Sequence, residues 1–401
     1  MSTLPIDALS PRTSADALSI PNAHARTRLA SIDALRGLVI VLMALDHVRD
    51  YFTNVSFDPL DLSQTTLELF LTRWVTHLCA PTFIFLAGVS AYLMSKKLET
   101  PALRRFLLTR GLWLIALEFT VVQFAWTFNL RYEHGLFMQV IWAIGASMIV
   151  LSLVVSWPRW LIGTCSLVLI AGHNLLDGIE PETFGQWSWV WNLVHVQGEL
   201  TYAFLLYPLI PWIAVMGLGF YAGVVFDLES DTRKRVLLRV GAMCLVAFVL
   251  LRAMNVYGDP HPWSGQSTVT LTLLDFLSVH KYPPSLLYLL ATLGIASILL
   301  GYLEKLKGRA FEVMQTFGRV PLFVYVLHIV LAHLAAGSIA LAMGFGDVLL
   351  KNLFLTAPEG WGFGLLGVYL AWIGVLMALY PACRWFGELK RRKRDWWLAY
   401  L

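Results

Sequence analysis

Residues 207–226 read YPLIPWIAVMGLGFYAGVVF and contain no charged side chain. A helix needs roughly 20 mostly apolar residues to cross the hydrocarbon core of a bilayer. Similar apolar runs recur along the whole chain of 401 residues, which is 58% hydrophobic and only 14% charged. Because a water-soluble chain carries about 25% charged residues, this composition excludes a soluble enzyme, a disordered chain and a nucleic-acid-binding protein.

The apolar runs predict an all-α fold, a polytopic membrane bundle of about ten transmembrane helices. We expect these helices near residues 34–52, 67–95, 103–126, 136–156, 158–176, 201–227, 235–254, 283–304, 318–344 and 363–387. The first 33 residues are polar and have no apolar core of a signal peptide, so they are expected to form a flexible tail. The predicted organisation is therefore a tail (1–33), a ten-helix domain (34–387) and a basic tail (388–401).

The distribution of positive charge predicts the orientation of the bundle. Of the 30 Lys and Arg residues, 24 fall at the two ends of the chain or in and beside the even-numbered connections. Only three, Arg131, Lys281 and Lys351, fall in the odd-numbered connections. Because positive loops stay on the cytoplasmic side, both termini are expected in the cytoplasm.

Charged side chains are concentrated in the first helix, which reads SIDALRGLVIVLMALDHVRDYF at residues 31–52. Asp46, His47 and Asp50 lie near its outer end, and Arg36 lies near its inner end. Charges within a span are costly and are functional candidates by default. Residues three or four apart share a helix face, so Asp46 can meet Arg49 and His47 can meet Asp50. A carboxylate beside an imidazole fixes its tautomer and raises its basicity. An inter-helix hydrogen-bonding role for His47 is the alternative.

This helix resembles the first-helix signature of the integral-membrane acyltransferase superfamily, in which an Arg-Gly pair precedes an essential His by eleven residues. Arg36-Gly37 and His47 have that interval. Within the superfamily, the chain is most similar to bacterial proteins related to heparan-α-glucosaminide N-acetyltransferase. The resemblance extends over stretches such as HLCAPTFIFLAG (77–88), TRGLWLIALEFTVVQFAWTF (109–128), AGHNLLDGI (171–179), YPLIPWIAVMGLGFYAG (207–223), HKYPPSLLYLLATLG (280–294) and GRVPLFVYVLHIVLAH (318–333).

The resemblance implies a membrane-embedded acyltransferase. It would move an acyl group, expected to be acetyl, from cytoplasmic acyl-CoA (acetyl-CoA) to a sugar or other hydroxyl or amine acceptor on the outer face. Its expected location is then the inner (cytoplasmic) membrane of a bacterium. In this interpretation Arg36 lies on the CoA side and His47 at the transfer centre. The lysosomal heparan enzyme has asparagine at the position of His47 and its reactive His in the following loop, whereas residues 53–66 here contain no His. Catalysis therefore falls to His47, with Asp46 or Asp50, or to His77; an acyl-histidine intermediate and direct transfer both stay open.

Several further side chains are candidates with a structural alternative. His77 follows Arg73 by one helical turn, so the two form either a pore-facing pair or inter-helix hydrogen bonds. Arg110 is a candidate for the CoA phosphates, together with Arg104 and Arg105. His328 would either line the acyl channel or be an internally bonded histidine of the bundle.

The outer end of the fifth span carries a second polar group. His173, Asn174 and Asp177 could bind a polyol acceptor, or Asn174 and Asp177 could only form a turn. The sequence shows no nucleotide-binding fingerprint and no metal-ligand spacing, so no metal is expected.

A proton-coupled secondary transporter of a small solute is the rival function, since His and Asp within a membrane can relay protons. Transporters usually carry internal repeats, and the absence of clear similarity between the two halves favours the enzyme. The expected partners are the lipid bilayer, acyl-CoA and an extracytoplasmic glycan or small-molecule acceptor, without nucleic acid. Assembly into a homo-oligomer stays open.

Overall fold

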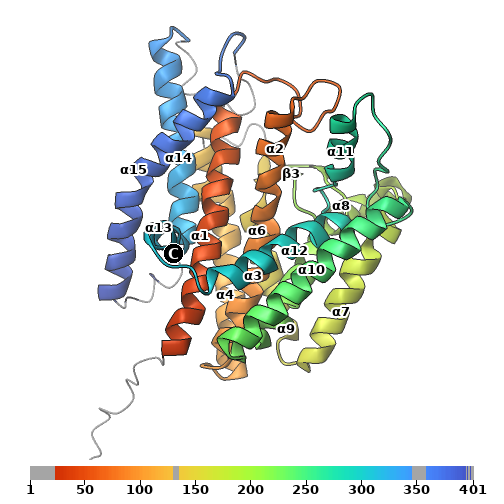
Figure 1. Cartoon of the computed structure of the whole chain (residues 1–401), viewed down its shortest axis with the longest axis vertical. Helices are drawn as coiled ribbons and strands as arrows, with labels where there is room; N and C mark the ends of the chain where they lie inside the picture. The colour runs from red at the N-terminus through yellow and green to blue at the C-terminus, as the bar shows by residue number, and fades with distance from the viewer. Residues whose placement is uncertain (1–22, 130–134, 346–357, 394, 396–397, 399–401) are drawn as a thin grey trace, which may run out of the picture.

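The computed structural model describes residues 23–129, 135–345, 358–393, 395 and 398, and it shows an all-α bundle with one small sheet (Figure 1). A helix lies at each of the ten predicted positions. The long elements are α1 (Ala23–Phe52), α2 (Leu67–Val75) with α3 (Cys79–Ser95), α4 (Thr100–Leu117) with α5 (Gln123–Thr127), α6 (Val140–Val154), α7 (Arg159–Gly172), α9 (Leu209–Ala222), α10 (Ser230–Met254), α12 (Leu286–Leu303), α14 (Pro321–Ala342) and α15 (Leu365–Arg392).

Eight of these helical segments are long and apolar enough to cross a bilayer. The two others differ for physical reasons that the sequence shows. α1 carries Arg36, Asp46, Arg49 and Asp50 within its apolar stretch, and α6 has only 15 residues. The multi-pass membrane architecture that we predicted is confirmed.

Three predicted helix boundaries are wrong. α1 begins at Ala23 and not near residue 34, so the polar segment before the apolar run is already helical. Helix was also expected from residue 136 and from residue 201. Instead β1 (Leu136–Met138), β2 (Gly198–Leu200) and β3 (Ala203–Leu205) form a three-stranded sheet in the order β1-β3-β2. β1 pairs with β3 in parallel, and β2 pairs with β3 antiparallel.

Ion pairs join several Lys- and Arg-rich connections at one end of the bundle, which we call the basic end. Lys96 pairs with Asp227 at 2.8 Å, and Lys305 pairs with Asp231 at 2.6 Å. At the opposite end, which we call the outer end, the main-chain amide of Leu286 donates to Asn174. Three of the Lys- and Arg-rich connections therefore lie together at one end of the bundle.

α1 lies inside the bundle and contacts α3, α12, α13 (Arg309–Gly318), α14 and α15 (Figure 1). Two glycines allow α13 to approach it closely. A Cβ at Gly37 would lie 1.7 Å from the carbonyl oxygen of Met314, and one at Gly318 would lie 1.8 Å from that of Asp33. The glycine of the Arg-Gly pair is therefore required by packing, since any side chain there would overlap the backbone of α13.

Candidate active site

His47 on α1 is hydrogen-bonded to His328 on α14, across 281 positions of sequence. Its Nδ1 lies 2.7 Å from Nε2 of His328. Trp126 and Tyr325 pack edge-on against the His47 ring, with centroid distances of 4.8 and 6.1 Å. His328 is fully buried, whereas His47 is partly exposed. His47 is thus the more accessible residue of the two.

The bonds of His328 fix the tautomers of both rings. Nδ1 of His328 lies 2.8 Å from the carbonyl oxygen of Val324, which can only accept, so this nitrogen carries the proton. In neutral His328 the Nε2 atom is then an acceptor, and Nδ1 of His47 donates to it. The Nε2 lone pair of His47 is left for chemistry. This arrangement resembles the orientation of a catalytic base by a hydrogen-bonding partner.

The carboxylates expected to orient His47 bind arginines. Asp46 pairs with Arg49 at 3.0 Å, as predicted, and with Arg73 at 3.1 Å. Asp50 also pairs with Arg49, at 2.7 Å. The expected pairing of His47 with Asp50 is therefore wrong: the hydrogen bond of His47 is made to an imidazole. The carboxylates and guanidiniums form a compact network in which opposite charges offset each other.

His77 is buried and lies where the α2–α3 helix tightens into a short 3-10 turn, η1 (Thr76–Leu78). Neither of its ring nitrogens has a hydrogen-bond partner among the residues that the structure describes. Its ring packs beside Tyr288 at 5.2 Å, while Arg73 reaches toward Asp46. Arg73 and His77 therefore have different partners: Arg73 bonds to Asp46 on α1, whereas the ring of His77 packs beside Tyr288.

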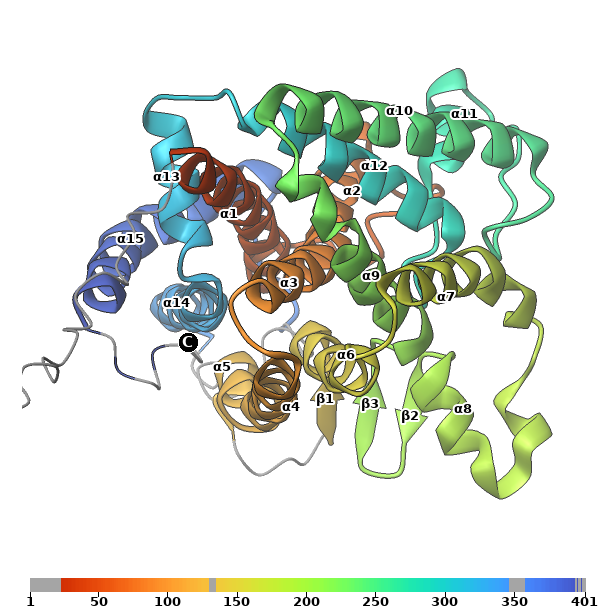
Figure 2. The ribbon, with the colours of Figure 1, turned by 90° about the horizontal axis from the view of Figure 1, so that it is seen from below.

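A cavity of about 340 Å³ opens near the basic end and extends into the bundle. Figure 2 shows the helices that supply most of its wall, α1, α3, α4, α6 and α14, next to one another. We call it the inner cavity. Four cationic side chains line it: Arg36, Arg110, Arg319 and Lys390. The rest of the wall is largely apolar and includes Phe83, Leu114, Ile144 and Met148.

The inner cavity reaches the neighbourhood of His47. Met43, one turn before His47 on α1, lines it, and so does Tyr325, whose ring contacts His47. Arg36 and His47 are eleven residues apart on one helix, which corresponds to about 16 Å along the axis. His328 is not part of the lining, and its bond to His47 fits the alternative expected for it, an internally bonded histidine of the bundle.

Arg36 is held in position by three partners from three elements. Its guanidinium donates to Asp33 at 2.9 Å, to the carbonyl oxygen of Gly318 at 3.3 Å and to Ser90 at 3.2 Å. Sequence reasoning identified Arg36 and Arg110 but missed Arg319 and Lys390. The basic composition of residues 390–394 pointed only to orientation, and α15 had to be folded back beside α1 to bring Lys390 to the cavity.

A second cavity, of about 440 Å³, lies at the outer end, and we call it the outer cavity. Polar side chains from three separate segments line it: Asn174, Asp177, His195, Gln197, His261 and His280. Burial, together with the neighbouring His261, lowers the pKa of His280, which keeps this ring neutral at pH 7. The outer cavity therefore offers imidazoles, amides and one carboxylate as hydrogen-bonding groups.

A family model described as the catalytic region of heparan-α-glucosaminide N-acetyltransferase matches residues 28–257, more than half of the chain. The matched range contains Arg36, His47, His77 and Arg110. His328, the partner of His47, lies beyond it. No individual curated protein matches the chain.

Proposed function

Since the chain belongs to the heparan-α-glucosaminide N-acetyltransferase family and is a multi-pass membrane transferase, we propose that it moves an acetyl group across the bilayer. The donor is acetyl-CoA at the basic end, on the cytoplasmic side, and the acceptor is a sugar amine or hydroxyl at the outer end. The observation that carries this proposal is the inner cavity, which has cations at its opening and ends beside His47.

The cations of the inner cavity suit the phosphates of CoA. A guanidinium group binds phosphate oxygens through two parallel hydrogen bonds. The inner cavity has three guanidinium groups, those of Arg36, Arg110 and Arg319. Apolar side chains beyond this cluster suit the less polar pantetheine arm and the thioester. A volume of about 340 Å³ falls in the range of small-molecule sites, about 300–1,000 Å³. We therefore assign the inner cavity to the donor.

His47 is the general base in this mechanism. Its Nε2 removes the proton from the acceptor as the acceptor nitrogen or oxygen attacks the thioester carbonyl carbon. The C–S bond then breaks, and the thiolate of CoA takes the proton back from His47. His328 positions the base, because its Nε2 accepts from Nδ1–H of His47 in both the neutral and the protonated form.

The outer cavity is assigned to the acceptor. Sugar hydroxyls and amines are recognised by side chains that both donate and accept, and Asn174, Gln197, His261 and His280 have this capacity. Since His47 lies toward the outer end of α1, an acceptor from that side and a thioester from the basic end can meet at its ring.

Purified protein in liposomes, supplied with radiolabelled acetyl-CoA and a glucosamine-terminated glycan, tests the proposal. We expect label on the glycan when the two substrates are on opposite sides of the membrane. Accumulation of unmodified solute without label transfer would contradict the proposal and favour a transporter. Label that stays on the denatured protein in the absence of acceptor would replace direct transfer by an acyl-histidine step at the same residue.

A further inference from the structure

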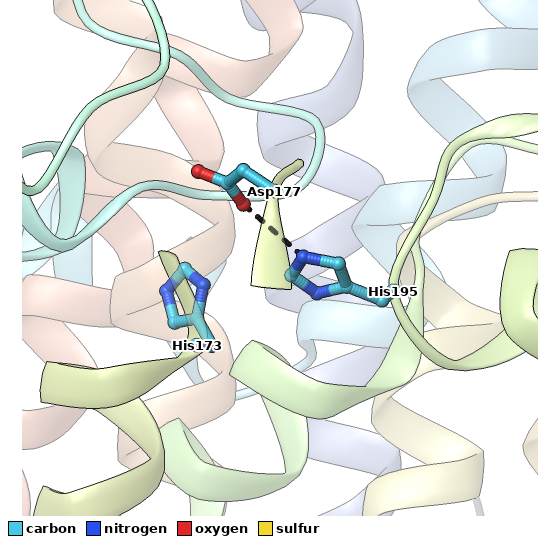
Figure 3. A group of neighbouring side chains, drawn as sticks. All are labelled: His173, Asp177 and His195. Carbon is cyan, nitrogen blue, oxygen red and sulfur yellow. Dashed lines mark hydrogen bonds and ion pairs between the residues drawn. The ribbon is translucent and has the colours of Figure 1, made fainter. Parts of the chain in front are cut away.

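A cluster of two imidazoles and a carboxylate lies beside the outer cavity, away from His47. His173 begins the 3-10 turn η3 (His173–Leu176) after α7, Asp177 follows that turn, and His195 follows α8 (Ser188–Val194). One ligand atom of each side chain lies within 4.8 Å of those of the other two. Figure 3 shows the three side chains around a common space.

The two imidazoles are buried with unused nitrogens. His173 is 2% exposed and His195 is 1% exposed. Both ring nitrogens of His173 and Nδ1 of His195 have no hydrogen-bond partner within the described part of the chain. Leaving such groups unpaired in a buried site is costly. An electron-pair acceptor bound to these nitrogens would therefore stabilise the site.

The carboxylate is oriented by two hydrogen bonds. Asp177 accepts from Nε2 of His195 at 3.1 Å and from the Asn174 amide at 2.8 Å. The carboxylate is therefore held next to the two imidazoles.

We propose that His173, Asp177 and His195 bind a divalent transition-metal ion, Zn²⁺, at the outer end of the bundle. A set of two imidazole nitrogens and one carboxylate oxygen suits Zn²⁺, whereas Mg²⁺ and Ca²⁺ prefer oxygen ligands alone. Three protein ligands leave a fourth position for water or an acceptor oxygen.

One of the three distances is already close to that of a tetrahedral site. Zn–N and Zn–O bonds of about 2.0–2.2 Å place ligand atoms about 3.3 Å apart. The separation of His195 Nε2 from Asp177 Oδ1 is 3.1 Å, while the three ligand atoms lie within 4.8 Å of one another, so the ring of His173 has to move toward the other two to close the site. Binding through Nε2 of His195 uses the tautomer whose proton is on Nδ1, so that Nε2 offers its lone pair.

The metal would join two segments that the chain separates. His173 and Asp177 lie just after α7, while His195 follows the segment that contains η4 (Pro181–Trp187) and α8. Asp177 and His195 also line the outer cavity. A bound ion therefore holds the wall of the outer cavity in place and contacts a molecule that enters the cavity. This role is separate from the proposed acetyl transfer at His47.

The test measures metal binding without acetyl-CoA, so its result is independent of the proposed transferase function. Full-length protein without a polyhistidine tag is placed in nanodiscs, stripped with a chelator and dialysed against Zn²⁺ or Mg²⁺. We expect about one Zn²⁺ per chain and no retained Mg²⁺. His173→Ala and Asp177→Asn should each weaken Zn²⁺ binding at least about tenfold.

His261→Ala is the matched control, since His261 lines the same cavity and its ring lies 4.9 Å from that of His280, outside the cluster. It should bind Zn²⁺ like the wild type. Wild-type protein that retains no Zn²⁺, or equal losses in His261→Ala and the cluster variants, would overturn the proposal. If His173→Ala fails to fold, Co²⁺ in the wild type decides: intense visible bands of a tetrahedral site support the proposal, and weak octahedral bands reject it.

Discussion

The inner and outer cavities differ in the kind of polarity that they present. The charged side chains that line the inner cavity are all cations, and the rest of its wall is largely apolar. These cations are Arg36, Arg110, Arg319 and Lys390. The outer cavity has imidazoles, amides and a carboxylate, and no Lys or Arg among its lining residues. Fixed positive charge selects phosphates, whereas neutral groups that donate and accept select hydroxyls and amines. This difference supports the proposal that each cavity receives a different substrate.

The residues between the two cavities are bonded to one another. His47 is bonded to His328, and Asp46 and Asp50 are bonded to Arg49 and Arg73. The proposed transfer centre at His47 is thus held by partners within the bundle, and in this proposal the two cavities determine which molecules reach it. Each prediction below tests one part of this division.

The largest expected effect is all-or-none and concerns the sides to which the cavities open. A reporter that is active only outside the cytoplasm should be active when fused after residue 190 or 268. It should be silent after residue 230 or 308, because Lys- and Arg-rich connections stay inside. The opposite pattern would place the inner cavity outside and remove the assignment of its cations to cytoplasmic CoA.

Loss of the base is the next largest effect. His47→Ala should lower kcat for acetyl transfer by about a hundredfold or more, since a general base acts in the transition state. Acetyl-CoA binding should stay near the wild-type level, because the cations of the inner cavity are unchanged.

Calorimetric titration with acetyl-CoA and single-turnover transfer measure these two quantities separately. Wild-type acetyl transfer by folded His47→Ala protein would move the catalytic role to His77, a buried histidine one helical turn from Arg73. A joint loss of binding and activity would indicate that His47 only supports the packing.

The donor assignment predicts a change in KM. Arg36→Ala and Arg110→Ala should each raise the KM for acetyl-CoA about tenfold or more, while kcat changes little, since a charge-assisted hydrogen bond contributes about 1.5–3 kcal/mol. Arg105→Ala is the control, because Arg105 is exposed on the same helix as Arg110 and does not line the cavity. Equal effects of all three variants would reduce the role of the arginines to general surface charge.

The sequence is sufficient to predict the helices because a membrane span follows from composition over about twenty residues. The same reasoning misplaced residues 136–138 and 203–205, where apolar strands pair across more than sixty positions. Short apolar runs do not distinguish strand from helix by periodicity alone. The early start of α1 was missed because a helix can continue beyond the membrane in polar sequence.

Side-chain partners were less predictable than positions. Spacing on one helix correctly paired Asp46 with Arg49, since residues three apart share a face. The partner of His47 comes from α14. His195, which lies beside His173 and Asp177, comes from the end of α8. Contacts between distant helices depend on how those helices pack, and helical periodicity carries no information about that.

The smallest effect that we predict concerns His328, which acts on the reaction only through His47. His328→Ala removes the acceptor for Nδ1–H of His47 and should lower kcat about two- to tenfold, in keeping with a net hydrogen-bond contribution of about 0.5–1.5 kcal/mol. The KM for acetyl-CoA should not change, because His328 does not line the inner cavity.

His328→Gln provides the discriminating comparison, since its side-chain oxygen can accept from His47 at a position near that of the imidazole Nε2. We expect His328→Gln to recover most of the kcat lost in His328→Ala. The two variants should be compared at matched amounts of folded protein, judged by thermal unfolding in the same detergent. If both lose activity only in proportion to folded protein, His328 is a packing residue, and the tautomer of His47 is fixed by its surroundings in another way. If His328→Gln alone restores kcat, the acceptor atom is what His47 requires.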